Sequence, residues 1–492
     1  MPKTPLSAFM QTKGKLTLAA LFCAIFCYCG VLYSGQNHLI AATAGITLLT
    51  AILWVTEALP IPVTSLIPFF AFPMAGVLTH TAAASALGSH VILLLMGGFM
   101  LSKSLEKSNV HTRLAVYMLR LTGTGSAKRL VLAFMLTAAV MSMWISNTAT
   151  TLMLLPIALA VLQTINNKKL TVAMLLGIAY AASLGGIGTP IGTPPNIIFM
   201  SVYLETQGKE ISFLQWMKTG LPIVFIGIPI IAFWLTRGLG KVGDCHFPVI
   251  NQWQSAEKRV LSVFLLVALA WIFRPYWTAL LNMPYVSDST IALAGVVLMF
   301  LTPSGTTNGP DKLQNSANEV EINVNSEEGK DKNQQSDDRL LDWQTASSIP
   351  WGMLLLFAGG ICIAKAFSAS GLSELMGQAL TGLSELPVLL LILSLCLFVT
   401  FLTEITSNTA TATLLMPILA SAGMAAGIDP ILLMAPAAIS ASCAFMLPVA
   451  TAPNAIVYGL DKFTIKTMAT EGLVLNILIA FVVAGVSYLT LA

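Results

Sequence analysis

The sequence predicts an all-α polytopic membrane protein built from two inverted repeats, and three observations carry that prediction. Hydrophobic residues make up 56% of the 492 residues and charged residues only 10%, whereas soluble proteins carry about 25% charged residues. A segment at 146–158, SNTATTLMLLPIA, returns with eight identities as SNTATATLLMPIL at 407–419. Each copy precedes a stretch punctuated by glycine or proline, at 186–196 and 447–454.

Apolar runs account for most of the remaining chain. A helix needs about 20 apolar residues to cross the hydrocarbon core, and eleven runs of suitable length lie outside the two copies of the repeated segment. We therefore expect eleven transmembrane helices. Their predicted ranges are 16–34, 39–58, 62–78, 88–104, 170–204, 214–236, 260–281, 288–303, 350–369, 430–460 and 468–491.

The two repeated segments are expected to form re-entrant helical hairpins. Each lies in a stretch, 130–165 or 384–424, that is too long for one crossing and has a polar middle. The predicted spans at 170–204 and 430–460 contain the glycine and proline stretches, so we expect each to be a broken helix. Backbone groups released by such breaks cannot be satisfied by lipid, and they are tolerated where they line a cavity.

Basic residues predict the orientation, because short cytoplasmic loops carry an excess of lysine and arginine. In the eleven-span topology all but four of the 25 basic residues fall in inner segments. The exceptions are Lys209, Lys218, Arg274 and Lys365, and we expect Arg274 and Lys365 to snorkel to the outer surface. The N-terminus is then cytoplasmic, the C-terminus lies outside the inner (plasma) membrane, and the hairpins enter from opposite faces.

The predicted organisation follows the duplication. The N-terminus and first span occupy 1–38, the first repeat 39–240, and the spans leading into the second repeat 241–303. Residues 346–492 hold the rest of the second repeat. The polar segment 304–345 interrupts the apolar pattern, and we expect a disordered cytoplasmic linker. A passive connection is favoured over a regulatory role.

Charge and motif content argue against other classes of protein. The net charge of +3 forms no nucleic-acid patch, and the seven cysteines lack the paired spacing of metal ligands. No HExxH or GxSxG motif occurs, and neither Ser146 nor Ser407 has a histidine partner for nucleophilic catalysis. An enzyme is therefore not expected.

Two further features of the spans have competing interpretations. Paired glycines, Gly97 with Gly98 and Gly359 with Gly360, are interpreted as close helix packing in preference to binding. Glu404 precedes the second Ser-Asn-Thr, whereas Met143 holds the equivalent place in the first copy. This asymmetry favours a structural hydrogen-bonding carboxylate over a gate or a proton site.

The tips of the two hairpins combine ligands for a cation and an anion. Serine and threonine hydroxyls, asparagine carbonyls and freed backbone carbonyls are hard, neutral ligands for an alkali cation. Asparagine NH2 groups and helix N-termini suit a carboxylate. None of the four motifs contains arginine or lysine, so a buried anion would need bound cations to offset its charge. We therefore expect sodium to be coupled to the anion.

The paired SNTAT segments, each followed by a GTPPN-like stretch, resemble the divalent anion:sodium symporter family over nearly the whole chain. The resemblance implies eleven spans in an inverted repeat, a homodimer, and a transport domain that slides past a scaffold. It also implies a first sodium site at Ser142, Ser146, Asn147 and Gly192 and a second at Thr403, Thr406, Asn408 and Ala450. The implied substrate-binding residues are Asn147, Thr148, Thr193, Pro194, Asn408, Thr409 and Thr451.

The expected function is secondary active import of a C4-dicarboxylate such as succinate by sodium-coupled symport. Sodium is the expected coupling ion, and no organic cofactor is expected. Sodium-independent exchange of a dicarboxylate or citrate is the main alternative, and sulfate symport is the third. An anion channel would be separated from these by its lack of saturation and of sodium dependence.

Overall fold

The structure, a computed structural model, describes residues 5–122, 126–163, 165, 167–240, 253–305, 339–379 and 387–492. Within the described residues the fold is all-helical, with 79% of those residues in helices, and the only β pairing is a single bridge between Pro303 and Arg339. The predicted fold class is therefore correct at the level of an all-α membrane protein.

The helices follow the two halves of the chain. The first half contains α1 (Pro5–Tyr33), α2 (His38–Thr56), α3 (Ile61–Thr64), α4 (Ile67–Met74), α5 (His80–Leu87), α6 (His90–Lys107), α7 (Val110–Thr122), α8 (Ala127–Ser142), α9 (Asn147–Gln163), α10 (Lys168–Gly185), the 3-10 turn η1 (Gly186–Gly188), α11 (Pro194–Gln207) and α12 (Phe213–Leu235). The second contains α13 (Ser255–Ile272), α14 (Arg274–Leu280), α15 (Asp288–Leu301), α17 (Trp343–Ser347), α18 (Trp351–Ser370), α19 (Leu372–Ala379), α20 (Val388–Thr403), α21 (Asn408–Ala426), α22 (Ile431–Ala441), α23 (Ala452–Tyr458) and α24 (Ile465–Leu491).

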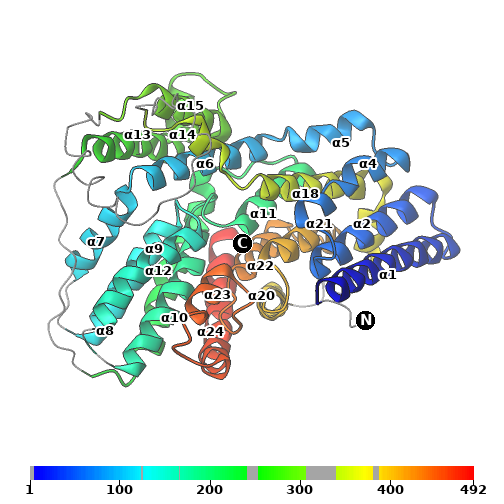
Figure 1. Cartoon of the computed structure of the whole chain (residues 1–492). Coiled ribbons are helices and arrows are strands. Elements are labelled where there is room, and N and C mark those ends of the chain that lie inside the picture. The colour runs from blue at the N-terminus through cyan, green and yellow to red at the C-terminus, as the bar shows by residue number, and fades with distance from the viewer. Residues whose placement is uncertain are drawn as a thin grey trace, which may run out of the picture.

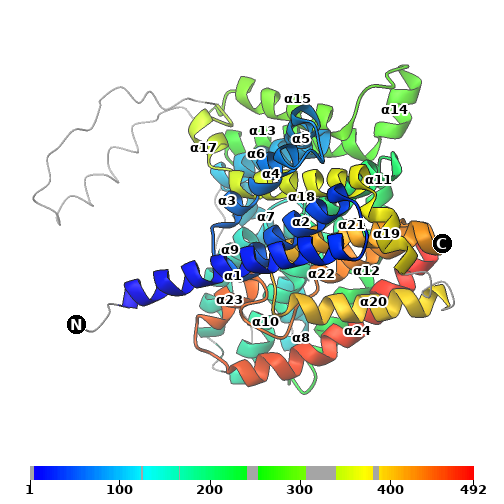
Figure 2. The same ribbon diagram turned by 90° about the vertical axis from the view of Figure 1, so that its right-hand side faces the viewer.

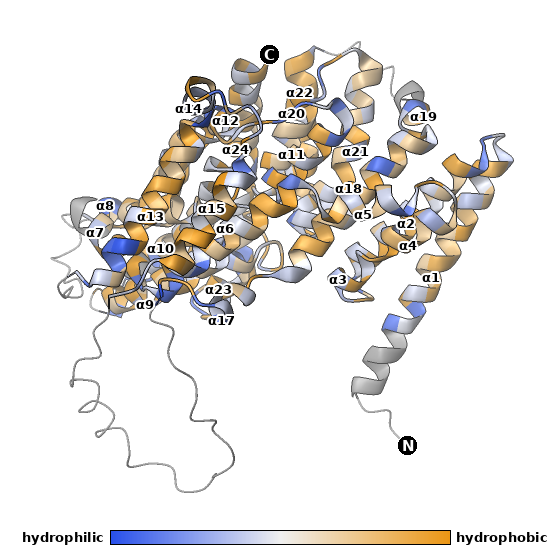
Figure 3. Ribbon diagram, turned by 90° about the horizontal axis from the view of Figure 1, so that it is seen from above, coloured by the Kyte–Doolittle hydropathy of each residue, from blue (hydrophilic) through white to orange (hydrophobic). Residues whose placement is uncertain are grey.

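The outer surface of the molecule is hydrophobic. Among the described residues, eight helices are long and apolar enough to cross a membrane, and α1, α2, α18, α20 and α24 run in roughly the same direction (Figure 2). Helices are predominantly hydrophobic in Figure 3, and aromatic side chains such as Phe26 and Phe233 are 73% and 78% exposed. Such exposure suits lipid and not water, which is why the chain is an integral membrane protein.

The polar Ser-Asn-Thr segments interrupt the helices where the sequence predicted a turn. Helix α8 ends at Ser142 and α9 begins at Asn147, while α20 ends at Thr403 and α21 begins at Asn408. In the first break, Ser146 Oγ accepts a hydrogen bond from the backbone N–H of Ala149 at 3.2 Å, which satisfies one of the free donors of a new helix. Each repeated segment therefore begins a helix at its asparagine.

Proline and asparagine shape the second break of each half. Both α11 and α23 begin with proline in their first turn, a position where its missing N–H costs no hydrogen bond. Asn196 Nδ2 donates to the carbonyls of Gly186 at 3.0 Å and Thr189 at 2.8 Å. Asn454 Nδ2 donates to the carbonyls of Ala444 at 3.0 Å and Leu447 at 3.1 Å. Equivalent asparagine side chains thus stabilise both unwound stretches with the same pair of hydrogen bonds.

The halves interlock around these breaks. Helix α11 of the first half packs against α21 and α22 of the second, and α23 of the second half packs against α9 and α10 of the first. In Figure 1, α11, α21, α22 and α23 lie between α8, α9 and α12 on one side and α1, α2 and α4 on the other. Each hairpin therefore meets the broken helix of the opposite half.

Close packing explains the paired glycines. A Cβ atom on Gly97 would lie 2.7 Å from the Cβ of Ala292, and one on Gly360 would lie 2.5 Å from Cγ2 of Thr413. Real Cβ contacts are not that short. A Cβ on Gly359 would lie 2.8 Å from the carbonyl oxygen of Ser65, so the packing interpretation is confirmed for Gly97, Gly359 and Gly360. Gly98 packs against Ile191 at 3.3 Å and also lines the cavity described below.

Arg274 and Lys365, which were expected to snorkel to the outer surface, both have acidic partners. Arg274 is only 12% exposed, and its guanidinium lies 2.8 Å from an oxygen of Asp288 and 3.1 Å from one of Glu210. Lys365 Nζ lies 3.6 Å from Glu205 and donates to Ser85 at 2.8 Å. Both cations therefore have acidic partners within the protein, which offset the cost of burying their charges.

The two ends of the expected linker lie side by side. Leu340 donates its backbone N–H to the carbonyl of Thr302 at 3.0 Å, beside the Pro303–Arg339 bridge. Lys107 Nζ lies 2.6 Å from Asp342 and donates to the carbonyl of Arg339 at 2.9 Å. Residues 339–345 are thus ordered, although they belong to the segment expected to lack structure. Residues 306–338 lie outside the described residues.

Candidate functional site

One cavity joins all four motifs. It has a volume of about 480 Å³ and is lined by both Ser-Asn-Thr segments and by both unwound stretches. All seven residues expected to bind substrate line it: Asn147, Thr148, Thr193, Pro194, Asn408, Thr409 and Thr451. Besides the two asparagines, three of the residues expected to bind sodium also line it: Ser146, Gly192 and Ala450.

A cluster of oxygens surrounds Asn147 behind the cavity wall. One arm of its amide lies 2.5 Å from Oγ of Ser142 and 3.3 Å from the carbonyl oxygens of Ala182 and Gly192. With its NH2 turned toward this cluster the amide donates to these three oxygens. With its carbonyl turned inward it supplies a fourth oxygen, and four neutral oxygens make a suitable environment for an alkali cation.

The second half repeats this cluster. Thr403 Oγ1 donates to Oδ1 of Asn408 at 2.7 Å and lies 3.1 Å from the carbonyl oxygen of Ala441. Ser142 and Thr403 are both fully buried, one layer behind the cavity that their asparagine neighbours line. The carbonyls of Ala182 and Ala441 were not predicted, although an Ala-Ser pair precedes each glycine or proline stretch and marks them as equivalent.

Thr406 stands apart from the oxygen cluster of the second half. Its Oγ1 donates to the carbonyl of Leu402 at 2.8 Å and lies 2.6 Å from Oγ1 of Thr411. These contacts lie within the hairpin itself, and Thr406 does not line the cavity. None of these contacts joins Thr406 to Thr403 or Asn408.

Glu404 holds the second unwound stretch in place. Its carboxylate accepts backbone N–H bonds from Phe445 at 2.7 Å, Met446 at 2.8 Å and Leu447 at 2.9 Å. Asn476 Nδ2 of α24 donates to the same carboxylate at 2.8 Å. With four donors around it and 3% exposure, Glu404 has the structural hydrogen-bonding role that the sequence favoured.

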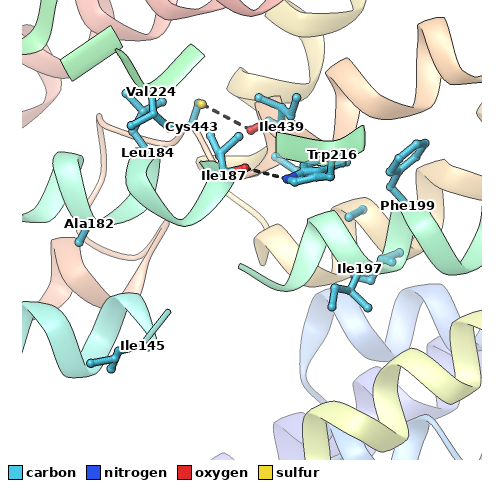
Figure 4. Packing of buried hydrophobic residues seen from close by; sticks show 14 of the residues in the cluster. Ile145, Ala182, Leu184, Ile187, Ile197, Phe199, Trp216, Val224, Ile439 and Cys443 are labelled. Atoms are coloured by element: carbon cyan, nitrogen blue, oxygen red, sulfur yellow. Dashed lines mark hydrogen bonds between the residues drawn. The ribbon is translucent and has the colours of Figure 1, made fainter. Parts of the chain in front are cut away.

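The first half fastens its unwound stretch with different residues. Thr189 Oγ1 donates to the carbonyl of Met143 at 2.5 Å, and Trp216 Nε1 donates to the carbonyl of Ile187 at 2.8 Å (Figure 4). Met143 is the residue equivalent to Glu404. The difference between Met143 and Glu404 therefore reflects different hydrogen bonds to the unwound stretches of the two halves.

Helix N-termini converge on the cavity. Helices α9, α11 and α21 begin at Asn147, Pro194 and Asn408, all of which line it. The N-terminus of a helix carries free N–H groups and a partial positive charge, which favour an anion. Thr451 Oγ1 accepts a hydrogen bond from Asn454 N at 3.2 Å, which leaves its hydroxyl proton free to donate.

Sequence reasoning missed a charged pair in the cavity wall. Lys103 and Glu106 of α6 both line the cavity, and Lys103 Nζ lies 2.6 Å from Oε2 of Glu106. In the predicted topology Lys103 is one of the basic residues of the inner segments, and only the four motifs themselves lack basic residues. Glu106 lies eight residues after Gly98, and Lys103 lies four residues after Phe99, so each shares a helix face with a residue that lines the cavity. That α6 itself borders the cavity is a result of tertiary packing.

The chain is duplicated, its halves interlock, its exterior is apolar, and a polar cavity lies at its helix breaks. This is the architecture of a secondary transporter. Residues 14–491 match the family model described as "Sodium:sulfate symporter transmembrane region", and the chain belongs to this family. It is a membrane transporter and not an enzyme.

Curated relatives are similar over most of their length. The chain is 38% identical over 477 residues to the "Sodium-dependent dicarboxylate transporter SdcS" of Staphylococcus saprophyticus, covering 90% of this chain and 84% of that protein. It is 36% identical over 469 residues to the protein of the same name from Staphylococcus aureus, with the same coverage.

Solved structures share the fold at low sequence identity. The YdaH transporter of Alcanivorax borkumensis superimposes with a TM-score of 0.55 at 14% identity, covering 92% of this chain and 98% of that one. MtrF of Neisseria gonorrhoeae gives a TM-score of 0.53 at 12% identity, covering 83% and 82%. At these identities the likeness concerns the fold alone.

Proposed function

We propose that this protein imports a C4-dicarboxylate such as succinate by sodium-coupled symport. The observation that carries the proposal is the meeting of both Ser-Asn-Thr segments in one cavity, each with oxygens clustered behind its asparagine. The names of the staphylococcal relatives, sodium-dependent dicarboxylate transporters, support the same substrate class and the same ion.

The sodium ions bind behind the asparagines. Ser142, Ser146, Asn147 and Gly192 form the first site, to which the carbonyl of Ala182 adds an oxygen. Thr403, Thr406, Asn408 and Ala450 form the second, with the carbonyl of Ala441. Each asparagine turns its carbonyl toward the ion, which leaves its NH2 group facing the cavity as a donor for a carboxylate.

The substrate carboxylates lie between the two halves. Asn147 and Thr148 meet one carboxylate, Asn408 and Thr409 meet the other, and Thr193, Pro194 and Thr451 complete the wall. The volume of about 480 Å³ falls within the roughly 300–1,000 Å³ of small-molecule sites. Since the motifs are neutral, the two ions supply the positive charge that makes the burial of a dianion favourable.

The transport cycle uses the inverted topology. Eleven spans cross the inner membrane, with the N-terminus cytoplasmic and the C-terminus outside. The α8–α9 hairpin enters from the cytoplasmic face and the α20–α21 hairpin from the outer face. Two copies form a homodimer in which the domain holding the cavity slides past a fixed scaffold, so that the loaded site faces each side in turn.

Counterflow in proteoliposomes tests this function. Vesicles preloaded with unlabelled substrate should accumulate labelled succinate only when sodium is present, and malate, citrate and sulfate should compete in an order that defines the preferred dianion. Accumulation that is equally fast without sodium would instead identify an exchanger. Preference for sulfate over every dicarboxylate would reject the substrate class.

A further inference from the structure

A second cavity lies away from the substrate site. Its volume is about 640 Å³, and it is formed where the beginnings of α10 and α24 meet the end of α12. Helix α12 packs against both α10 and α24 (Figure 1). The residues that line it are Lys168, Lys169, Val172, Ala173, Leu235, Arg237, Leu239, Phe463, Thr464, Thr467 and Glu471.

The polar part of this cavity is basic. Lys168, Phe463 and Thr464 also line an adjoining hollow of about 540 Å³, to which Lys462 and Lys466 contribute. The five cations face two carboxylates: Asp461, and Glu471, which lies 2.7 Å from the guanidinium of Arg237. None of the four lysines forms an ion pair with a residue that the structure describes, so their charge is available to a ligand.

Two helix N-termini add to the positive potential. The side chain of Asn167 accepts from the backbone N–H of Leu170 at the start of α10, a helix of 18 residues. Thr464 caps α24, a helix of 27 residues, in the same way. Residues of the first turns of both helices line the cavity, among them Lys168, Lys169 and Thr467, and the N-terminus of a helix favours a phosphate or another oxyanion.

The remaining walls are apolar. Leu235, Leu239 and Phe463 are buried, and Ala173 and Val172 extend the hydrophobic surface along α10. Arg237 lies over the ring of Trp234 at 3.8 Å, and tryptophan is enriched at the membrane interface. A hydrophobic wall below a basic rim matches a headgroup joined to acyl chains better than a small soluble anion.

We infer that this cavity binds the phosphate headgroup of an anionic phospholipid, such as phosphatidylglycerol, from the leaflet on the side of these helix ends. The positive-inside pattern predicts that this is the cytoplasmic leaflet, where basic pockets between helices bind anionic headgroups. Bound lipid bridges α10, which leads into the first unwound stretch, and α24, whose Asn476 holds Glu404. It therefore stabilises the helices on which both breaks depend.

Native mass spectrometry and thermal unfolding of the full-length protein in detergent test this inference. Phosphatidylglycerol should form retained adducts and raise the unfolding temperature, whereas phosphatidylcholine should do neither. The triple variant Lys168→Gln/Lys169→Gln/Lys462→Gln should weaken phosphatidylglycerol binding by about tenfold or more. The matched control is Lys128→Gln/Arg129→Gln, an exposed basic pair in the first turn of α8, which also has a capped N-terminus, and it should bind as the unsubstituted protein does.

Soluble phosphates distinguish binding of a lipid headgroup from binding of a free phosphate. Inorganic phosphate or glycerol 3-phosphate at the same concentration should give no protection. Equal protection by either would overturn the lipid assignment, as would equal binding of phosphatidylcholine. Equal phosphatidylglycerol binding by the triple variant and the control would overturn the site itself. If the triple variant does not yield monodisperse protein, Lys462→Gln/Lys466→Gln provides the same comparison.

Discussion

At the scale of single residues, the proposed function depends on two asparagines with matched surroundings. Asn147 lies beside the hydroxyl of Ser142 and the carbonyls of Ala182 and Gly192, and Asn408 lies beside the hydroxyl of Thr403. Each amide stands between an oxygen cluster and the cavity, so it can serve an ion with one atom and a carboxylate with the other. Loss of either side chain removes both contacts together.

Asn147→Ala and Asn408→Ala should each abolish sodium-dependent uptake of labelled succinate while leaving expression intact. Hydrogen bonds to charged groups contribute about 1.5–3 kcal/mol, and each substitution also removes an ion ligand. The measurement is initial uptake in proteoliposomes. Asn282→Gly is the control, because Asn282 lies in an exposed turn at a φ of 53° that glycine adopts readily. Normal uptake by either alanine variant would place the site elsewhere.

The Lys103–Glu106 pair gives a second prediction at this scale. Lys103→Gln should raise the KM for the dianion several-fold, because it leaves the Glu106 carboxylate unpaired in the wall of the cavity proposed to bind the anion. The double variant Lys103→Gln/Glu106→Gln should recover much of the lost affinity. Uptake over a range of succinate concentrations provides both values. Additive losses in the double variant would show that the pair does not act on the substrate by charge.

At the scale of elements, the positions of the helix breaks follow from local chemistry. The side-chain contacts that hold the breaks in place do not. Polar residues within an apolar run, proline in a first helical turn and an asparagine at the same place in both halves predicted the hairpin tips and the unwound stretches. The contacts of Glu404 with Asn476 and of Arg274 with Asp288 join residues far apart in the sequence. Such pairs depend on tertiary packing, which periodicity and motif spacing do not contain.

Glu404→Gln should lower the unfolding temperature in detergent without changing the pH dependence of uptake. The carboxylate of Glu404 offers two acceptor oxygens to the backbone N–H groups of Phe445, Met446 and Leu447. Glutamine offers only one, so at least one of these N–H groups is left without an acceptor. A buried unpaired donor costs about 1–3 kcal/mol. Glu374→Gln, at an exposed position in the first turn of α19, should have little effect on stability.

The opposite pattern would indicate a different role for Glu404. If Glu404→Gln kept its unfolding temperature but shifted the pH profile of uptake, the carboxylate would act as a proton site. The comparison of stability with pH dependence therefore distinguishes the two interpretations that the sequence left open.

At the scale of the whole molecule, duplication places two similar half-sites in one cavity. Helix α11 reaches across to α21, and α23 reaches across to α9, so neither half encloses the cavity alone. The repeats predicted this convergence from the sequence, since matched breaks in two halves are typical of a shared binding site. Lys103 escaped prediction because α6 belongs to neither motif and joins the cavity only through packing.

Deletion of Asn315–Gln335 should leave uptake and unfolding temperature nearly unchanged. The chain leaves the described structure after residue 305 and returns at 339, where the Thr302–Leu340 hydrogen bond at 3.0 Å joins the two ends. Adjacent ends need little chain to connect them, and the free energy of loop closure varies only slowly with length. A large loss of uptake in a stable deletion variant would indicate a regulatory role for this segment.

In the proposed mechanism, a neutral cavity binds a dianion through bound sodium. Calorimetric titration of succinate into the purified, detergent-solubilised protein at a series of sodium concentrations measures this coupling. The affinity for succinate should rise with sodium, binding should be undetectable when potassium or choline replaces sodium, and succinate should raise the affinity for sodium in return. Succinate affinity that stays the same in the absence of every alkali cation would contradict this mechanism.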